Sequence, residues 1–173
     1  MGFEMMNYEH SKTRVLFVCM GNICRSPVAQ AIFEKKVAQA GLSDYVSADS
    51  AGTDHFHVGQ KPDSRSQHAA AFRGYTLQGQ TARQISVEDF AEFDLIMAMD
   101  WHNLRTLQNM CDEQYRHKIE LVMRYAQNLE DAEVPDPYYQ NQHAFSVVVD
   151  YLEDAVSGLL EVVKRRVPQD VAA

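Results

Sequence analysis

The chain has 173 residues, enough for one domain with a full hydrophobic core. With 16 Lys and Arg against 24 Asp and Glu, its formal charge of −8 argues against a general nucleic-acid binder and against a basic membrane anchor. The 3 cysteines are too few for a disulfide scaffold and odd in number, so we expect a cytoplasmic protein.

The termini carry no recognisable targeting signal. The start, MGFEMMNYEHSKTR, contains the early acidic residue Glu4 and lacks the apolar core of a signal peptide. No apolar run approaches the roughly 18 residues that cross a bilayer. We therefore expect no membrane association, an N-terminal extension over residues 1–12, and a single domain over 13–167.

Strand and helix patterns alternate along the rest of the chain. Residues 15–18 form a short, continuous apolar run, typical of a buried parallel strand. Ser26 is predicted to be a helix N-cap and Pro27 the first helical residue, with the helix ending at Gly41. The further expected elements are a strand over 46–50, a helix over 62–74, a short helix opened by a capping box at 86–89, a strand over 95–99, a helix capped by Asp100, a strand over 119–123 and a long helix over 145–163.

This alternation predicts an α/β fold: a three-layer open sheet of four parallel strands flanked by helices. Ligands in such sheets bind beyond the carboxyl ends of the strands. The segment that follows the first strand is therefore the first place to look for a functional site.

Residues 19–26 join the first strand to the first helix. Backbone N–H groups of a tight loop and of a helix N-terminus together bind anions. Gly21 permits a turn that other residues resist, and Asn22 tolerates a left-handed conformation. Arg25 offers a planar fork for two phosphate oxygens. We expect a phosphate-binding loop after the first strand.

Cys19 stands at the start of that loop. Its thiol would face the loop N–H groups and Arg25, which stabilise a negative charge. Its pKa should therefore fall below the value of about 8.5 of a free thiol, and the thiolate could attack phosphorus. Arg25 and the loop N–H groups would stabilise the developing charge. A Cys-x5-Arg pattern alone is weak, because Cys19 and Cys24 could both be buried apolar side chains. The preceding strand and the following Ser-Pro strengthen the phosphate interpretation.

A leaving phenoxide also needs a proton, and Asp136 is the best candidate for a general acid. The prolines on either side of it keep this loop out of helix and sheet. Tyr138 and Tyr139 could form walls for a flat aromatic substrate. The alternative reading is an ordinary surface turn.

Taken together, these segments resemble the low-molecular-weight protein tyrosine phosphatases over roughly residues 13–163. VLFVC at 15–19, GNICRSP at 21–27 and DPYY at 136–139 carry the resemblance. It implies hydrolysis of phosphotyrosine proteins or peptides through a phosphocysteine, without cofactor or metal. By position, Cys19 is the nucleophile, Arg25 binds the phosphate, and Asp136 is the general acid and base. Inorganic phosphate is the implied product, and a tyrosine kinase is one candidate partner.

The resemblance also assigns supporting residues. Asn22 and Ser26 match residues that shape the loop and stabilise the thiolate, and Ser50 matches a hydroxyl that supports Asn22. Cys24 matches a second cysteine that protects the nucleophile through a reversible disulfide. The full set for phosphate binding and loop support is Met20, Gly21, Asn22, Ile23, Cys24, Ser26 and Ser50, and the substrate cleft comprises Phe56, Tyr138 and Tyr139.

Two departures and three alternatives accompany this interpretation. Phe56 replaces a Trp that many members carry, and Gln80 replaces a His that hydrogen-bonds toward the loop asparagine. An arsenate reductase would need relay cysteines, of which only Cys111 lies downstream. An arginine phosphatase tends to carry Thr in place of Ile23. A phosphate-binding adaptor would lack one or more of the catalytic residues. The pair His55 and His57 lacks a third metal ligand.

Overall fold

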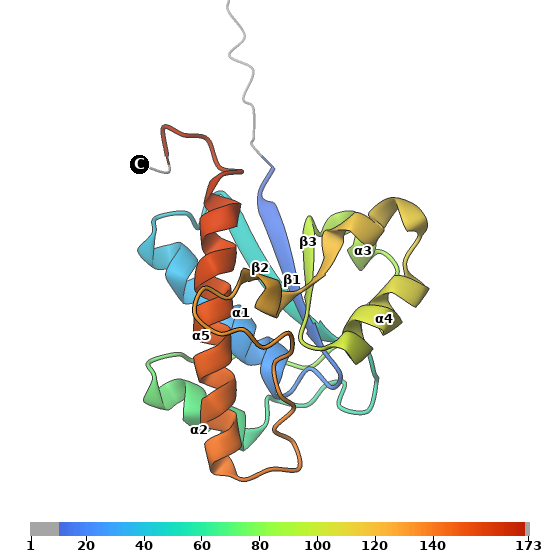
Figure 1. Ribbon diagram of the computed structural model, residues 1–173, viewed down its shortest axis with the longest axis vertical. Coiled ribbons are helices and arrows are strands. Elements are labelled where there is room, and N and C mark those ends of the chain that lie inside the picture. The colour runs from blue at the N-terminus through green and yellow to red at the C-terminus, as the bar shows by residue number, and fades with distance from the viewer. Residues whose placement is uncertain (1–10, 172–173) are drawn as a thin grey trace, which may run out of the picture.

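The computed structural model describes residues 11–171, which contain a parallel sheet of four strands between two layers of helices (Figure 1). The strand order is β2-β1-β3-β4. The strands are β1 (Thr13–Cys19), β2 (Val46–Gly52), β3 (Leu95–Ala98) and β4 (Ile119–Leu121). The predicted fold class is confirmed.

Helices cover both faces of the sheet. In Figure 1, α1, α2 and α5 lie on one side of the sheet, and α3 and α4 lie on the other. The helices are α1 (Arg25–Gln39), α2 (Ser64–Phe72), α3 (Asp89–Glu92), α4 (Trp101–Met110) and α5 (Gln142–Lys164), and two short 3-10 helices are η1 (Glu113–Lys118) and η2 (Val122–Tyr125).

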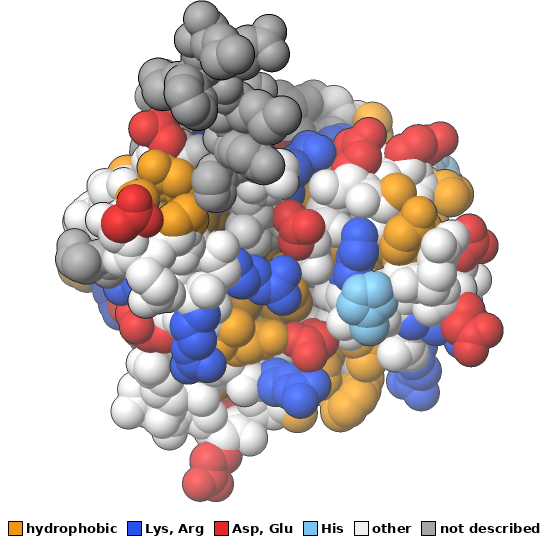
Figure 2. Space-filling model, turned by 90° about the horizontal axis from the view of Figure 1, so that it is seen from above, with side chains coloured by type: hydrophobic (Ala, Val, Ile, Leu, Met, Phe, Trp, Pro, Cys, Tyr) orange, Lys and Arg blue, Asp and Glu red, His pale blue; other side chains and the backbone are white. Residues whose placement is uncertain are grey.

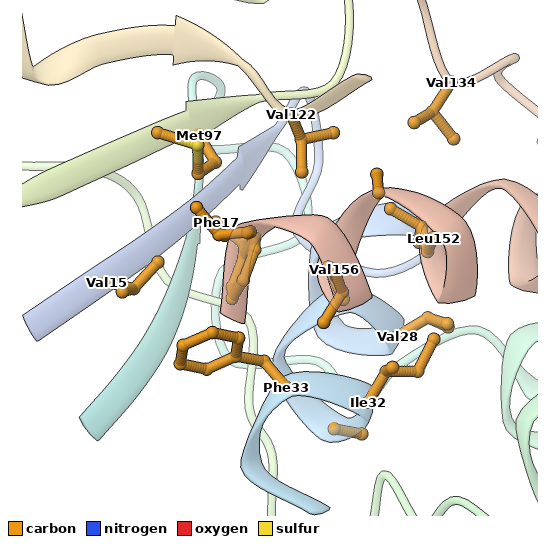
Figure 3. Packing of buried hydrophobic residues seen from close by; sticks show 14 of the residues in the cluster. Val15, Phe17, Val28, Ile32, Phe33, Met97, Val122, Val134, Leu152 and Val156 are labelled. Atoms are coloured by element: carbon orange, nitrogen blue, oxygen red, sulfur yellow. The ribbon is translucent and has the colours of Figure 1, made fainter. Parts of the chain in front are cut away.

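The larger core lies between the sheet and helices α1 and α5 (Figure 3). Successive side chains of a strand point to opposite faces, so Val15 and Phe17 of β1 enter this core. Phe17 meets Phe33 of α1 edge to face, with ring centroids 5.6 Å apart. Burying an aromatic or branched side chain stabilises the fold by roughly 1.5–3 kcal/mol. The contact between Phe17 and Phe33 therefore holds α1 against β1.

A second core fills the opposite face of the sheet. Leu16 and Val18 of β1 pack there with Ile96 of β3, Phe90 and Leu107. Both faces of β1 are therefore buried, which explains why its sequence is a continuous apolar run rather than an alternating one.

Three sequence-based boundaries need correction. Helix α1 begins at Arg25, and Ser26 is not its N-cap, because the Ser26 hydroxyl is engaged by the side chains of Asn22 and Cys19. Strand β2 continues to Gly52, whose N–H donates to the Arg83 carbonyl. Strand β4 ends at Leu121, where the chain turns into η2.

Figure 2 shows the end of the molecule around the amino ends of the strands, where acidic and basic side chains are interspersed. Within residues 11–171, no helix has the length and apolar character to cross a bilayer. The expected extension over residues 1–12 falls almost wholly outside the described residues.

Candidate active site

The loop after β1 is held in shape by Asn22, which is 3% exposed and has a φ of 56°. Its Nδ2 donates to Ser26 Oγ at 2.8 Å and to Ser50 Oγ at 2.9 Å. Its Oδ1 accepts the N–H of Arg83 at 2.9 Å. These three bonds stabilise the left-handed conformation, so the predicted roles of Asn22 and Ser50 agree with the geometry.

Gly21 is needed for a different reason from the one expected. Its φ is not positive, but a Cβ at this position would lie 2.9 Å from Cδ2 of His57. Glycine therefore lets the His57 ring pack against the loop. Gly52 serves a similar purpose on the inner side, where a Cβ would lie 2.6 Å from the carbonyl oxygen of Met20.

Cys19 lies at the end of β1, and its Sγ is 3.0 Å from Ser26 Oγ. The Ser26 hydroxyl also lies 3.4 Å from the carbonyl oxygen of Ala51. Because Ser26 Oγ already accepts a hydrogen bond from Asn22, its own hydrogen can be donated either to the Cys19 sulfur or to the Ala51 carbonyl. A thiolate at Cys19 attracts that hydrogen, since hydrogen bonds to charged acceptors are the stronger ones.

The second loop cysteine has a different environment. Burial raises the pKa of Cys24 to about 12, and the nearby Cys19 and Asp63 add to the effect. Cys24 therefore remains a neutral thiol near pH 7, which leaves Cys19 as the nucleophile candidate in the loop. Both are free cysteines in this structure, so the protective disulfide stays a prediction.

Arg25 is the cation of the site, and its side chain is 3% exposed. Its Nη1 donates to Asp100 Oδ2 at 2.7 Å and to the Val134 carbonyl at 3.0 Å. Burial lowers its pKa, but Cys19 and Asp100 outweigh this and the pKa lies above its ordinary value. Nε has no hydrogen-bond partner among residues 11–171. A buried guanidinium with an unpaired N–H is suited to an anion.

Asp100 has two functions in one carboxylate. Oδ1 accepts the N–H of Asn103 at 2.7 Å and so caps α4, as predicted. Oδ2 orders Arg25.

Asp136 reaches the site on the loop that leads to α5. Its Oδ2 lies 3.7 Å from Nη2 of Arg25, and its side chain is 48% exposed. Its Oδ1 accepts the N–H of Tyr138 at 3.1 Å, which fixes the carboxylate against its own loop. Val134 ties this loop to the sheet, because its N–H donates to the Met99 carbonyl at 2.8 Å.

These groups surround a cleft of about 340 Å³, a size that suits a small ligand. Tyr138 forms one wall, and Tyr139 and Phe56 stand at the mouth, 90% and 72% exposed. The cleft-lining residues are Cys19, Met20, Gly21, Ile23, Cys24, Arg25, Asp54, Phe56, His57, Asp136, Tyr138 and Tyr139. Asn22, Ser26 and Ser50 are not among them and brace the loop through the hydrogen bonds described above.

Sequence reasoning did not identify Asp54 and His57 as cleft residues. They lie in an irregular segment whose path no periodic pattern predicts. His57 pairs through Nδ1 with Gln60 Oε1 at 3.0 Å. No group of three residues suited to a metal ion occurs in the described part of the chain.

Two further residues have clear positions. Gln80 does not contact Asn22; its Nε2 donates to the Pro27 carbonyl at 3.0 Å. Gln80 therefore does not take the place of that His in the hydrogen bonds to Asn22, which are made by Ser26, Ser50 and Arg83. Arg83, whose backbone N–H bonds to Asn22, forms structural ion pairs with Asp49 at 3.0 Å and with Asp89 at 2.9 Å.

Fold and site together define a class of protein: an α/β fold whose first strand places a cysteine at the start of a loop that closes on a buried arginine. The family described as low molecular weight phosphotyrosine protein phosphatase matches residues 14–169. The chain belongs to this family of hydrolases.

Similar proteins occur in distant organisms. A Synechocystis protein named within the same family is 49% identical over 148 residues, which cover 85% of this chain and 94% of the relative. The low molecular weight phosphotyrosine protein phosphatase of Rattus norvegicus is 45% identical over 136 residues, covering 78% and 85%. The crystal structure of a protein tyrosine phosphatase from Entamoeba histolytica, with Hepes in its active site, matches with a TM-score of 0.87 at 39% identity, covering 90% and 99%.

Proposed function

We propose that this protein hydrolyses phosphotyrosine in proteins or peptides through a phosphocysteine on Cys19. The observation that carries the proposal is the buried guanidinium of Arg25. Its Nε has no hydrogen-bond partner within the described residues, and its side chain lines the same cleft as Cys19. The names of the relatives supply the class of substrate.

In the first step, the Cys19 thiolate attacks phosphorus and a P–S bond forms. The bond between phosphorus and the tyrosyl oxygen breaks, and its electron pair leaves with that oxygen. A protonated Asp136 donates its proton to the leaving oxygen, so tyrosine departs as a neutral phenol. Arg25 and the loop N–H groups stabilise the charge on the three equatorial oxygens.

In the second step, water attacks the phosphorus of the phosphocysteine. Asp136, now ionised, accepts a proton from the water, and the P–S bond breaks. Inorganic phosphate leaves and the Cys19 thiolate is restored. Ser26 stabilises that leaving thiolate, because its hydroxyl can turn from the Ala51 carbonyl to the sulfur.

The shape of the cleft supports an aromatic ester. Tyr138 and Phe56 line it, and both present rings against which a phenyl phosphate can stack. We also propose the cytoplasm as the location, since three cysteines without a disulfide suit a reducing compartment. We also propose a tyrosine kinase as a partner, because the names of the relatives give phosphotyrosine as the substrate.

The test compares four proteins with p-nitrophenyl phosphate and a phosphotyrosyl peptide as substrates. We expect wild type to release phosphate, Cys19→Ser to release none, and Asp136→Ala to lose about 100-fold or more in kcat on the peptide. Cys111→Ser is the matched control, because Cys111 lies in the core on the other face of the sheet. It should retain wild-type rates.

Four outcomes would overturn the proposal. Cys19→Ser with undiminished activity would exclude the covalent route. Arsenate-dependent consumption of thiols that exceeds phosphate release would favour an arsenate reductase. Faster cleavage of phosphoarginine than of phosphotyrosine would reverse the substrate class, and tight binding of phosphopeptide without turnover would indicate an adaptor.

A further inference from the structure

A chain of hydrogen bonds runs from the nucleophile to the outside of α1. Gln30 of α1 accepts the Ser50 hydroxyl at its Oε1, at 2.8 Å. Its Nε2 donates to Oε1 of Glu34, one helical turn further on, at 3.0 Å. Ser50 continues the chain through Asn22, and Asn22 through Ser26 to Cys19.

The directions of these bonds are fixed at both ends. The N–H of Arg83 can only donate, so it sets Oδ1 of Asn22 toward itself and turns Nδ2 toward the two serines. The carboxylate of Glu34 can only accept, so it turns Nε2 of Gln30 toward itself and Oε1 toward Ser50.

Each serine therefore has one hydrogen left to donate. Ser50 gives its hydrogen to Gln30, and Ser26 has Cys19 and the Ala51 carbonyl as acceptors. Donors and acceptors in such a chain polarise one another, so an acceptor on Ser50 makes its oxygen a better acceptor for Asn22. Asn22, fixed in this way, donates to Ser26 Oγ and so orients the Ser26 hydroxyl to donate its hydrogen to the Cys19 sulfur.

We propose that Gln30 is a positioning residue for the reaction, whose amide oxygen sets the direction of the hydrogen-bond chain that stabilises the Cys19 thiolate. This inference rests on the proposed function of Cys19 as the nucleophile. Gln30 touches neither the cleft nor the sulfur, so it acts only through Ser50, Asn22 and Ser26.

Other charged and titratable groups also act on the sulfur or on the far end of the chain. Those near the sulfur or lining the cleft are Cys24, Arg25, Asp54, His57, Asp100 and Asp136, and those near Gln30 are Glu34 and Asp49. A test must keep the net charge of this set constant while the acceptor on Ser50 changes.

Gln30→Met removes the acceptor and keeps the length and helix propensity of the side chain. The double variant Gln30→Glu with Glu34→Gln keeps an acceptor oxygen opposite Ser50 and leaves the net charge unchanged. Gln39→Met is the matched control, since Gln39 is an exposed glutamine of the same helix.

The readout is the midpoint pH of Cys19 alkylation by iodoacetamide, measured together with kcat/KM for p-nitrophenyl phosphate. A neutral hydrogen bond contributes roughly a fivefold factor, and part of that reaches the sulfur. In Gln30→Met we expect the midpoint to rise by about 0.5 pH unit and kcat/KM below neutral pH to fall by about 3- to 5-fold. The double variant and Gln39→Met should match wild type.

A purely structural role would lower the unfolding midpoint and leave the alkylation pH unchanged. The proposal is overturned if Gln30→Met alkylates at the wild-type pH, or if the double variant shifts as far as Gln30→Met does. Failure of the proposed function is a separate result, because it would appear as absent phosphate release by wild type while alkylation still reports the thiolate.

Discussion

Replacing Asp100 by Asn separates the two interactions of its carboxylate. Asn is as good an N-cap as Asp, so the bond from the N–H of Asn103 and the start of α4 should persist. The charge that orders Arg25 is lost, together with the 2.7 Å bond from Nη1. Of the hydrogen bonds that Arg25 makes within residues 11–171, the one to the Val134 carbonyl then remains, beside the 3.7 Å ion pair with Asp136.

The size of the effect follows from burial. Hydrogen bonds to charged groups contribute about 1.5–3 kcal/mol, and the Asp100 side chain is 20% exposed, which favours the lower end of that range. Since Arg25 must meet the equatorial oxygens in a defined orientation, we expect kcat to fall by about 10-fold. Two effects on phosphate affinity oppose each other: the less ordered Arg25 weakens binding, and the loss of the negative charge of Asp100 near the dianion strengthens it. The inhibition constant of phosphate should therefore change less than about 3-fold.

The assay measures kcat and the inhibition constant of phosphate, with urea unfolding of the same variants. Asp100→Ala, which also loses the cap, should show a further loss of about 1 kcal/mol in unfolding free energy. Asp150→Asn, which removes a surface charge paired with Arg73, is the control. Wild-type kcat in Asp100→Asn would refute the reasoning, because Arg25 would then be oriented without Asp100.

Three further predictions concern stability. Burial raises the pKa of Asp89, but hydrogen bonds from Arg83 and from a backbone N–H outweigh it and the pKa lies below its usual value. This stabilisation is present above about pH 3.9 and is lost as pH falls through the lowered folded-state pKa. Urea unfolding should therefore show Asp89→Asn less stable than wild type at pH 7, with a difference that shrinks as the pH falls below about 3.9. Gly158→Ala should lower Tm by about 5 °C or more despite the better helix propensity of alanine, because the new Cβ would overlap the carbonyl of Tyr125. Phe17→Ala should lower the unfolding free energy by about 3–5 kcal/mol in chemical denaturation.

Each of these predictions has a clear contrary result. A difference for Asp89→Asn that persists unchanged at low pH would mean that the ion pair with Arg83 is not its source. A stabilised Gly158→Ala would show that α5 and η2 can move apart. A loss below 1 kcal/mol in Phe17→Ala would contradict the tight packing of Phe17 against Phe33.

The sequence predicts most of the sheet because local signals and tertiary packing agree there. The apolar run of β1 is buried on both faces, and Asp100 caps α4 as its position before the helix indicates. Ser26 shows where this reasoning fails. Its sequence context favours an N-cap, but tertiary partners outcompete the helix N–H groups for its hydroxyl.

Site residues divide in the same way. Cys19 and Arg25 could be placed together from the sequence because their motif lies between a recognisable strand and helix, whereas Asp136 was assigned through the family resemblance. The role of Gln30 could not be predicted from the sequence, because Gln30 has the pattern of an ordinary half-buried helical residue. Only the tertiary structure shows that Ser50 of β2 lies beside it. His57 likewise gains its place only through the close approach that Gly21 permits. Such contacts depend on tertiary structure and leave no periodic signal.

The most direct test of the account is rapid mixing of the enzyme with p-nitrophenyl phosphate, acid quenching within one turnover and mass analysis of the loop peptide. The account predicts a phosphoryl group on Cys19 and a burst of p-nitrophenol that approaches one equivalent per enzyme. A turnover that releases phosphate with no phosphoryl group on Cys19 at any time would contradict it.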